Sequence, residues 1–228
     1  MRGKKASLRS LTAWQARQAA TRCGSVSGGD SVEEAGGAGG GAASANAGKP
    51  AGYLYNQLIN FRDGRRHYPM MTYMVEHLPD AYLREIADYF SQQHPPYSPP
   101  AAGSGASASA ASLARGQRLV QQGDPGLKLP ACVACHGAAL TGVAPAIPGL
   151  LGLSSDYINA QFGAWRNQSR RAAAPDCMAD IAGRLTGADI AAISAWLGRQ
   201  TPDADARPAA ATSPIAPLPL RCGSVPAP

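Results

Sequence analysis

One five-residue run, Cys132-Val133-Ala134-Cys135-His136, constrains this chain more than any other feature of its sequence. Within one helical turn both thiols can reach the same flat cofactor, and a histidine follows directly. The pattern C-x-x-C-H is typical of covalent c-type haem attachment, in which the cysteines form thioether bonds and the histidine binds the iron. The run therefore predicts a haem attached through Cys132 and Cys135, with His136 as an iron ligand.

Two other kinds of site use closely spaced cysteines: a zinc half-site and a redox dithiol. A zinc site would need a second close pair of cysteine or histidine residues, and the sequence has none. A thioredoxin-like dithiol would accompany a βαβ pattern, yet no stretch of this chain alternates as a strand does. Haem is therefore the favoured interpretation of the cysteine pair.

The chain also contains an internal repeat, with the second copy three residues longer than the first. Shifted by 104, Gly48, Tyr53, Gln57, Phe61 and Arg62 fall on Gly152, Tyr157, Gln161, Trp165 and Arg166. Shifted by 107, Met71, Leu78, Ile86 and Tyr89 fall on Met178, Leu185, Ile193 and Trp196. Apolar residues at helical spacing, such as Leu83, Ile86, Ala87 and Phe90, predict that both copies are helical.

Composition divides the chain into five segments. We expect a low-complexity, disordered or non-native segment at 1–47, a degenerate domain without a haem motif at 48–97, a linker at 98–112, a haem domain at 113–200 and a Pro/Ala-rich tail at 201–228.

Together these features resemble the class I c-type cytochromes, specifically the two-haem kind built from tandem similar domains. The resemblance covers about residues 48–200 and rests on Gly116, Cys132-x-x-Cys135-His136-Gly137, Pro148-Gly149-Leu150-Leu151-Gly152, Met178 and Trp196. It implies an all-α fold, in which a cytochrome c-like helical domain follows a degenerate copy of itself.

The resemblance also implies roles for single residues. Met178 would be the second axial ligand of the iron, the carbonyl of Pro148 would accept the other N–H of His136, and Gly116 would let the first helix press against the last. Trp165 and Arg166 could reach the haem propionates. Ordinary alternatives stay open: Met178 as core filler, Pro148 as a loop proline, Trp165 as core and Arg166 as a solvated side chain.

One part of the family pattern is missing. A first C-x-x-C-H should lie about 104 residues before Cys132, near Gly28, where the sequence has no such motif. We therefore expect one haem per chain, with Met71 left without an iron. Our hypothesis is that a shifted reading frame or a misplaced start produced residues 1–47, which would explain the lost motif and the absent secretory signal together.

Two permanent axial ligands leave no open position on the iron, which disfavours oxygen or peroxide chemistry. We expect an electron carrier, not an enzyme, that shuttles single electrons in a respiratory chain. A soft thioether ligand favours ferrous iron and predicts a high reduction potential. The expected partners are redox proteins such as a terminal oxidase or a dehydrogenase. Three alternatives stay open: an electron-accepting haem subunit of a dehydrogenase, a haem peroxidase and a non-haem metal-binding module.

The remaining features concern environment and partners. The net charge is +6, and residues 1–47 account for half of it, so charge makes no case for nucleic acid. No run is long enough to span a membrane. Haem attachment predicts a periplasmic protein, although the basic start lacks the apolar stretch of a signal. His67, His77 and His94 stand alone in polar surroundings and are expected at the surface.

The three other cysteines are scattered at positions 23, 177 and 222. In an oxidising compartment Cys177 and Cys222 could pair, which would strap the tail across the haem pocket. Two free thiols are the alternative. Cys23 has no assigned partner.

Overall fold

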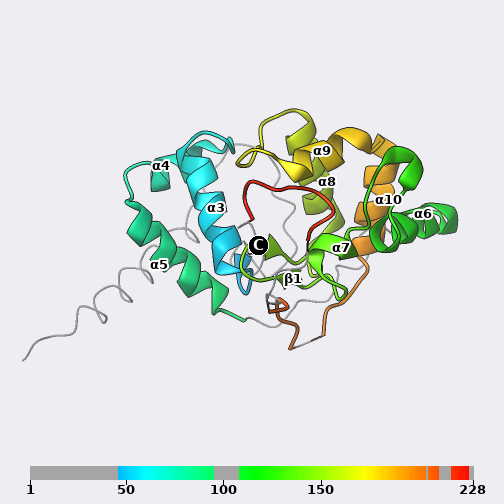
Figure 1. The fold of residues 1–228 in the computed structure, drawn as a ribbon, viewed down its shortest axis with the longest axis horizontal. Coiled ribbons are helices and arrows are strands. Elements are labelled where there is room, and N and C mark those ends of the chain that lie inside the picture. Colours follow the sequence, from blue (N-terminus) through cyan, green and yellow to red (C-terminus); the bar gives the residue numbers. More distant parts are fainter. Residues whose placement is uncertain (1–45, 95–107, 204, 211–216, 226–228) are drawn as a thin grey trace, which may run out of the picture.

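The computed structural model describes residues 46–94, 108–203, 205–210 and 217–225 (Figure 1). These ranges form two groups of helices, here called the first unit (residues 46–94) and the second unit (residues 108–203). The expectations for residues 1–45, Cys23 and most of the linker lie outside the described residues. Among those described, no helix is both long and apolar enough to cross a membrane.

The first unit consists of α3 (Ala51–Arg62), α4 (Pro69–Val75) and α5 (Asp80–Ser91). Helix α4 opens with a proline, which suits the first helical turn because that amide has no partner there. Helix α3 packs against both of the others, and Phe61, Val75 and Leu83 are buried between them. Leu83 and Ala87 are buried, as the helical spacing predicts.

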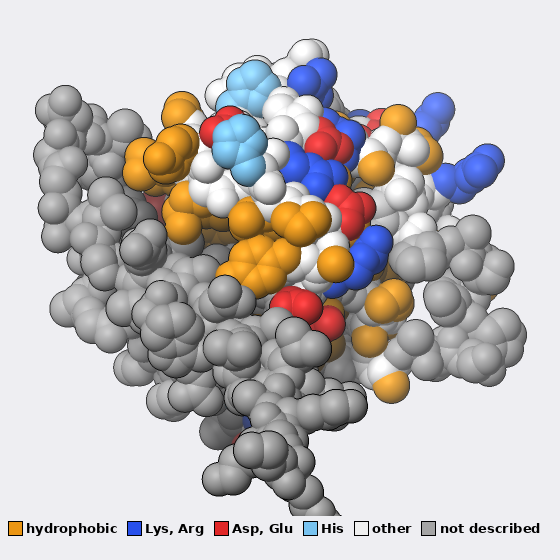
Figure 2. Space-filling view, turned by 90° about the vertical axis from the view of Figure 1, so that its left-hand side faces the viewer, with side chains coloured by type: hydrophobic (Ala, Val, Ile, Leu, Met, Phe, Trp, Pro, Cys, Tyr) orange, Lys and Arg blue, Asp and Glu red, His pale blue; other side chains and the backbone are white. Residues whose placement is uncertain are grey.

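One face of the first unit carries apolar side chains in the open. Figure 2 shows this face, with apolar groups gathered over part of it. The large exposed apolar residues are Tyr68, Met70 and Tyr73, which lie at or in α4.

The second unit is larger. Its elements are α6 (Ala110–Gln121), a 3-10 turn (Pro125–Leu127), α7 (Val133–His136), β1 (Gly142–Val143), β2 (Ile147–Pro148), α8 (Ser155–Arg166), α9 (Cys177–Arg184) and α10 (Gly187–Leu197). Helix α10 begins with a capping box in which Thr186 and Asp189 satisfy each other's backbone amides. The expectation of no strand was wrong, since β1 and β2 pair antiparallel. Strands of two residues each are too short to show alternation.

Helices α6 and α10 pack closely against each other in the second unit. A Cβ added to Gly116 would lie 2.2 Å from the Ala192 carbonyl oxygen and 3.0 Å from the Trp196 Cβ. Only a glycine allows the two helices to approach so closely, which confirms the packing predicted for Gly116.

The internal repeat is visible in the helix bounds. Helix α3 spans Ala51–Arg62 and α8 spans Ser155–Arg166, so both ends are offset by 104 residues. Helices α4 and α5 follow α3 along the chain, just as α9 and α10 follow α8. Within residues 46–94 no helix corresponds to α6 or α7, which carries the haem motif.

After α10 the chain returns to the middle of the molecule. Ala209 forms a parallel β-bridge with Val143, beside the β1–β2 hairpin. Residues 217–225, red in Figure 1, then run between α3 and α7.

Candidate haem-binding site

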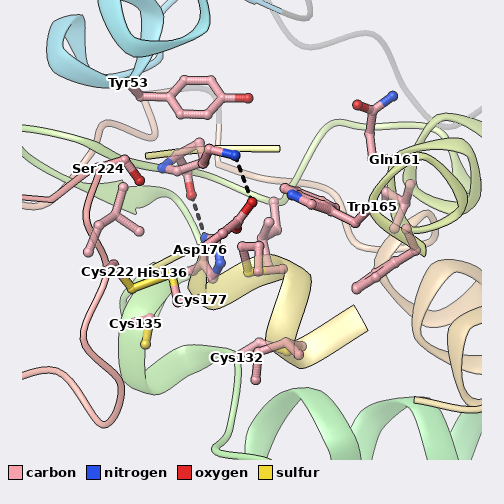
Figure 3. Close-up of a pocket in the computed structure, with 18 of the residues that line it drawn as sticks. Tyr53, Cys132, Cys135, His136, Gln161, Trp165, Asp176, Cys177, Cys222 and Ser224 are labelled. Carbon is pink, nitrogen blue, oxygen red and sulfur yellow. Dashed lines mark hydrogen bonds between the residues drawn. A yellow bond between two sulfur atoms is a disulfide. The ribbon is translucent and has the colours of Figure 1, made fainter. Parts of the chain in front are cut away.

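A cavity of about 190 Å³ lies between the two units. Figure 3 shows its walls. Polar side chains of α3 face apolar side chains of the second unit across it. The apolar walls include Leu119, Leu129, Ile158, Phe162, Leu185 and Leu197. All four predicted site residues, Cys132, Cys135, His136 and Met178, line this cavity.

The two cysteines stand at the start and within the single turn of α7. They are not bonded to each other. Desolvation raises the pKa of Cys132 to about 11 and also raises the pKa of Cys135. A redox dithiol has a lowered pKa, and zinc requires thiolates. Among the described residues, moreover, no three His, Cys, Asp or Glu side chains gather to hold a metal ion. The pair fits thioether attachment better than either alternative.

His136 ends α7 and is buried, with 8% of its surface exposed. Its Nδ1 lies 2.7 Å from the carbonyl oxygen of Pro148. A carbonyl only accepts, so Nδ1 donates its proton and Nε2 keeps a lone pair for a metal. Burial lowers the pKa of His136, which keeps the imidazole neutral. The histidine is therefore prepared as an iron ligand, and Pro148 sits where the resemblance expects its carbonyl.

Met178 enters the cavity from the first turn of α9. The helix is capped by Asp176, whose carboxylate accepts the amides of Ala179 at 3.0 Å and Ala172 at 2.7 Å. Met178 is partly buried against the core of the second unit. Its thioether thus shares one cavity with the imidazole of His136, so both groups could bind the iron of one haem.

A group of hydrogen-bond donors lies on the cavity wall near α8. The indole Nε1 of Trp165 is buried and has no partner among the described residues. The guanidinium of Arg170 lies 4.0 Å from the centre of the Trp165 ring and is 5% exposed. Its Nη2 also donates to the hydroxyl of Tyr53 at 3.2 Å. Such a group suits a carboxylate like a haem propionate.

The structure decides between the two alternatives left open for Arg166. Arg166 is exposed and lies outside the cavity, since it ends α8 on the solvent side. Arg170, four residues further on, is buried and lines the cavity instead. The signal that could have found Arg170 was the repeat, because a shift of 104 places Arg66 on Arg170.

Lys49 was also missed. It lies directly before α3, is 9% exposed and lines the cavity. Its Nζ donates to the carbonyl oxygen of Gly149 at 2.9 Å, and burial lowers its pKa. The other copy of the repeat has an apolar residue, Leu153, at the equivalent position. His67, His77 and His94 are exposed, as predicted.

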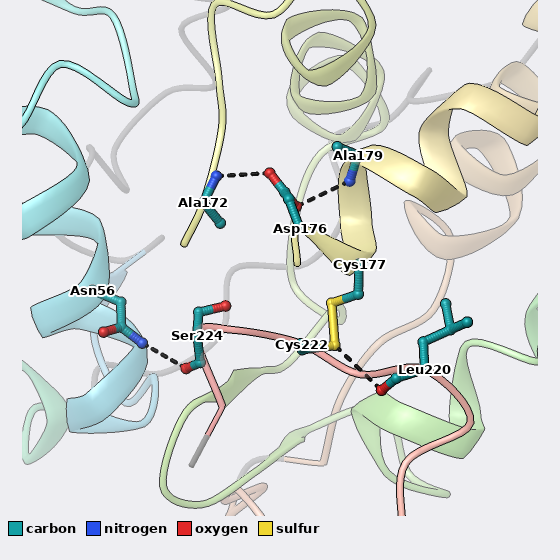
Figure 4. The surroundings of a disulfide bond; sticks show 8 residues. All are labelled: Asn56, Ala172, Asp176, Cys177, Ala179, Leu220, Cys222 and Ser224. Carbon is teal, nitrogen blue, oxygen red and sulfur yellow. Dashed lines mark hydrogen bonds between the residues drawn. A yellow bond between two sulfur atoms is a disulfide. The ribbon is translucent and has the colours of Figure 1, made fainter. Parts of the chain in front are cut away.

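The tail closes one side of the cavity. Cys177 and Cys222 form a disulfide, shown in Figure 4, with their Cα atoms 5.1 Å apart. That separation lies within the range a disulfide needs. Beyond it, the carbonyl oxygen of Ser224 accepts the side-chain amide of Asn56 at 2.8 Å. Of the two alternatives left open by the sequence, the structure forms the bridge.

Several known proteins are similar to this chain in sequence. It is 38% identical over 154 residues to the thiosulfate dehydrogenase electron acceptor of Thiomonas intermedia, a match that covers 68% of this chain and 69% of the relative. It is 32% identical over 153 residues to cytochrome c4 of Pseudomonas aeruginosa, covering 66% and 72%. The chain belongs to this family of c-type cytochromes. No family model matches it.

Solved structures of the family agree with the fold. Cytochrome c4 of Acidithiobacillus ferrooxidans superposes with a TM-score of 0.53 at 27% identity, covering 68% of this chain and 88% of that one. The thiosulfate dehydrogenase TsdBA of Marichromatium purpuratum gives a TM-score of 0.59 at 30% identity. The match covers 68% of this chain but spans only 32% of the TsdBA chain. The all-α cytochrome fold and the electron-transfer function are thereby confirmed, and the chain is a carrier of electrons through haem c.

Proposed function

We propose that this cytochrome carries one covalent haem, attached through Cys132 and Cys135, with His136 and Met178 as its axial ligands. The observation that carries the proposal is the cavity itself. It holds both thiols and the thioether, together with a neutral imidazole whose Nδ1–H donates a hydrogen bond to the carbonyl of Pro148. Residues 113–200 form the haem domain, and residues 48–97 form a domain without haem.

Each group in the cavity has a task. When bound, haem supplies a one-electron couple between ferric and ferrous iron. His136 offers Nε2 as a ligand, and Pro148 holds the ring in one tautomer. Met178 offers a soft sulfur that favours the ferrous state and so raises the reduction potential. Apolar walls exclude water. With both His136 and Met178 bound, the iron would have no open position for a substrate, which argues against a peroxidase.

The count of one haem rests on the first unit. Residues 46–94 contain no cysteine, so nothing there can form a thioether bond. Met71, the equivalent of Met178, packs with the cluster of Phe61, Val75 and Leu83.

The relatives also suggest a partner. Two of them are named as electron acceptors of a thiosulfate dehydrogenase. We infer that this chain likewise accepts electrons from a dehydrogenase that oxidises thiosulfate, and passes them on toward a terminal oxidase. The disulfide between Cys177 and Cys222 supports a periplasmic location, since such bonds persist in oxidising compartments.

Haem staining on a denaturing gel and the pyridine haemochrome assay test this proposal together. We expect a stained band and one haem per polypeptide in the wild type. The C132S/C135S double variant should lose the stain. Two haems per chain would overturn the count, and an unstained wild type would overturn the proposal itself. For the partner, purified thiosulfate dehydrogenase with thiosulfate should reduce the cytochrome, whereas no reduction would exclude that enzyme as donor.

A further inference from the structure

We infer that the first unit positions the axial histidine of the second unit. Lys49 and Gly52, at the start of α3, hold the loop 145–149, whose carbonyl at Pro148 orients His136. The inference rests on the proposed function, because His136 must be the iron ligand. It assigns a task to a unit that has no haem of its own.

Two hydrogen bonds cross from the first unit to this loop. The backbone N–H of Gly52 donates to the carbonyl oxygen of Pro145 at 3.0 Å. The Nζ of Lys49 donates to the carbonyl oxygen of Gly149 at 2.9 Å. The backbone amides in the first turn of a helix have no partner within that helix, so α3 can donate one of them to the loop. The two bonds hold the loop at both ends, on either side of Pro148.

The fit between α3 and the loop leaves no room for a side chain. A Cβ added to Gly52 would lie 2.7 Å from the Pro145 carbonyl oxygen and 3.4 Å from the Ala146 Cβ. Even an alanine would therefore push α3 away from the loop. Ala146 and Ile147, between the two bonds, are buried.

The loop 145–149 contacts the proposed ligand His136 through Pro148. Between the two anchored carbonyls, the carbonyl of Pro148 accepts the Nδ1 proton of His136 at 2.7 Å. Partners of this kind fix the orientation of a ligating histidine and its basicity. Lys49 is thus a positioning residue, which acts on the ligand through Gly149 and Pro148.

Lys49 also brings a positive charge to the wall of the cavity. Lys49 and His136 line the same cavity. A nearby cation favours ferrous over ferric iron, because reduction removes one positive charge from the haem. Since the equivalent residue of the repeat is Leu153, this charge belongs to the first unit alone.

The test uses Lys49→Met, Lys49→Arg and Lys128→Met in the full haem-bearing chain. Lys128 is exposed, so its variant removes the same charge from the surface. We expect K49M to lower the ferrous-to-ferric ratio at a fixed ambient potential by on the order of tenfold, about 59 mV for one electron. It should also change the haem-methyl shifts in the NMR spectrum of the ferric protein, which report the orientation of the histidine ring. K49R should stay close to the wild type, and K128M should leave both readouts unchanged.

A second pair of variants separates position from charge. Gly52→Ala changes no charge but forces α3 off the loop, so it should change the haem-methyl shifts. Gly163→Ala is the control, because a Cβ there would meet nothing within 4 Å.

Wild-type values in both K49M and G52A overturn the positioning role, and so does a K128M variant that shifts as far as K49M. A wild type without covalent haem overturns the proposed function and this inference together. Covalent haem with silent variants overturns the inference alone.

Discussion

Arg66 and Arg170 meet across the seam between the two units, where they form an isolated antiparallel β-bridge. They are equivalent positions of the repeat, and so are the residues beside them. The amide of His67 donates to the carbonyl of Ser169 at 2.7 Å, and the amide of Arg171 donates to the carbonyl of Arg65 at 2.7 Å. The seam is thus built twice from the same pattern, with each copy completing the other.

The two guanidiniums bind each other's units through neutral groups. Arg66 donates to Gln161 at 3.0 Å, and Arg170 donates to Gln57 at 3.2 Å. Within the described residues, neither pairs with a carboxylate. Burial lowers the pKa of Arg66, and the charge of Arg170 lowers it further.

The variant Arg170→Met should therefore weaken the seam. It removes the donor that serves Tyr53, Gln57 and Gln161. Both glutamines then keep only their bond from Arg66, and the Tyr53 hydroxyl loses the guanidinium. We expect the free energy of unfolding in urea to fall by about 1–3 kcal/mol. Arg166→Met, an exposed control, should stay within about 0.5 kcal/mol of the wild type. Equal stability of the two variants would show that the seam does not depend on Arg170.

Replacing Met178 with alanine should remove the second axial ligand. The weak sulfur-to-iron absorption band of the ferric protein should disappear, and the reduction potential should fall because the soft ligand is lost. Met71→Ala is the matched control, since Met71 holds the equivalent place in the repeat without a haem. A band that survives in M178A would assign the ligand elsewhere.

The disulfide between Cys177 and Cys222 should appear as one linked peptide in an unreduced digest. Its loss in Cys222→Ser frees a chain segment closed over a sequence separation of 45. We expect the variant to be less stable by about 2–4 kcal/mol. Treatment of the wild type with a reductant should reproduce the change. Separate Cys177 and Cys222 peptides in the unreduced digest would contradict the bridge.

The capping box of α10 predicts that the stability of the protein depends on pH in the acidic range. Desolvation opposes ionisation of Asp189, but hydrogen bonds from Thr186 and Arg115 outweigh it, so the pKa of Asp189 lies below its ordinary value of 3.8. A carboxyl group whose pKa is lower in the folded than in the unfolded state stabilises the protein at pH values above its unfolded-state pKa. This contribution is lost as the pH falls through the folded-state pKa.

Asp189→Asn should therefore lower the free energy of unfolding by about 1 kcal/mol at neutral pH. The difference should be smaller below pH 3.8, where the wild type loses the same contribution. Urea unfolding at several pH values measures this. Asp88→Asn, at an exposed position, should show no such difference. A cost for D189N that is independent of pH would exclude the ionised carboxylate as its cause.

Amides of α3 and α5 should exchange with deuterium faster than those of α10. The buried cluster of the first unit contains Phe61, Val75 and Leu83 alone, whereas α10 lies in a core of eleven buried residues. Fewer buried contacts permit local opening at lower cost. Hydrogen exchange of the intact protein, followed by mass spectrometry, measures the difference. Equal protection of α3 and α10 would show that docking on the second unit makes up for the small core.

The sequence by itself determined the local parts of this protein. The spacing of Cys132, Cys135 and His136 is set within one helical turn, so it carries its meaning without the rest of the fold. Helix periodicity located α5 and α10, and the repeat aligned α3 with α8 at both ends. The resemblance to class I c-type cytochromes indicated Met178 as the candidate ligand, and the repeat, which pairs it with Met71, supports that choice.

Tertiary structure decided everything that depends on which surfaces meet. Arg166 and Arg170 are four residues apart, and only the packing of the first unit on α8 buries one and exposes the other. Lys49 reads as a surface residue until α3 docks on the loop that holds Pro148. The pairing of Cys177 with Cys222 stayed open in the sequence, because bridging them needs a short distance that only the return of the tail provides. Burial and long-range contact are properties of the folded whole, and a local pattern has no access to them.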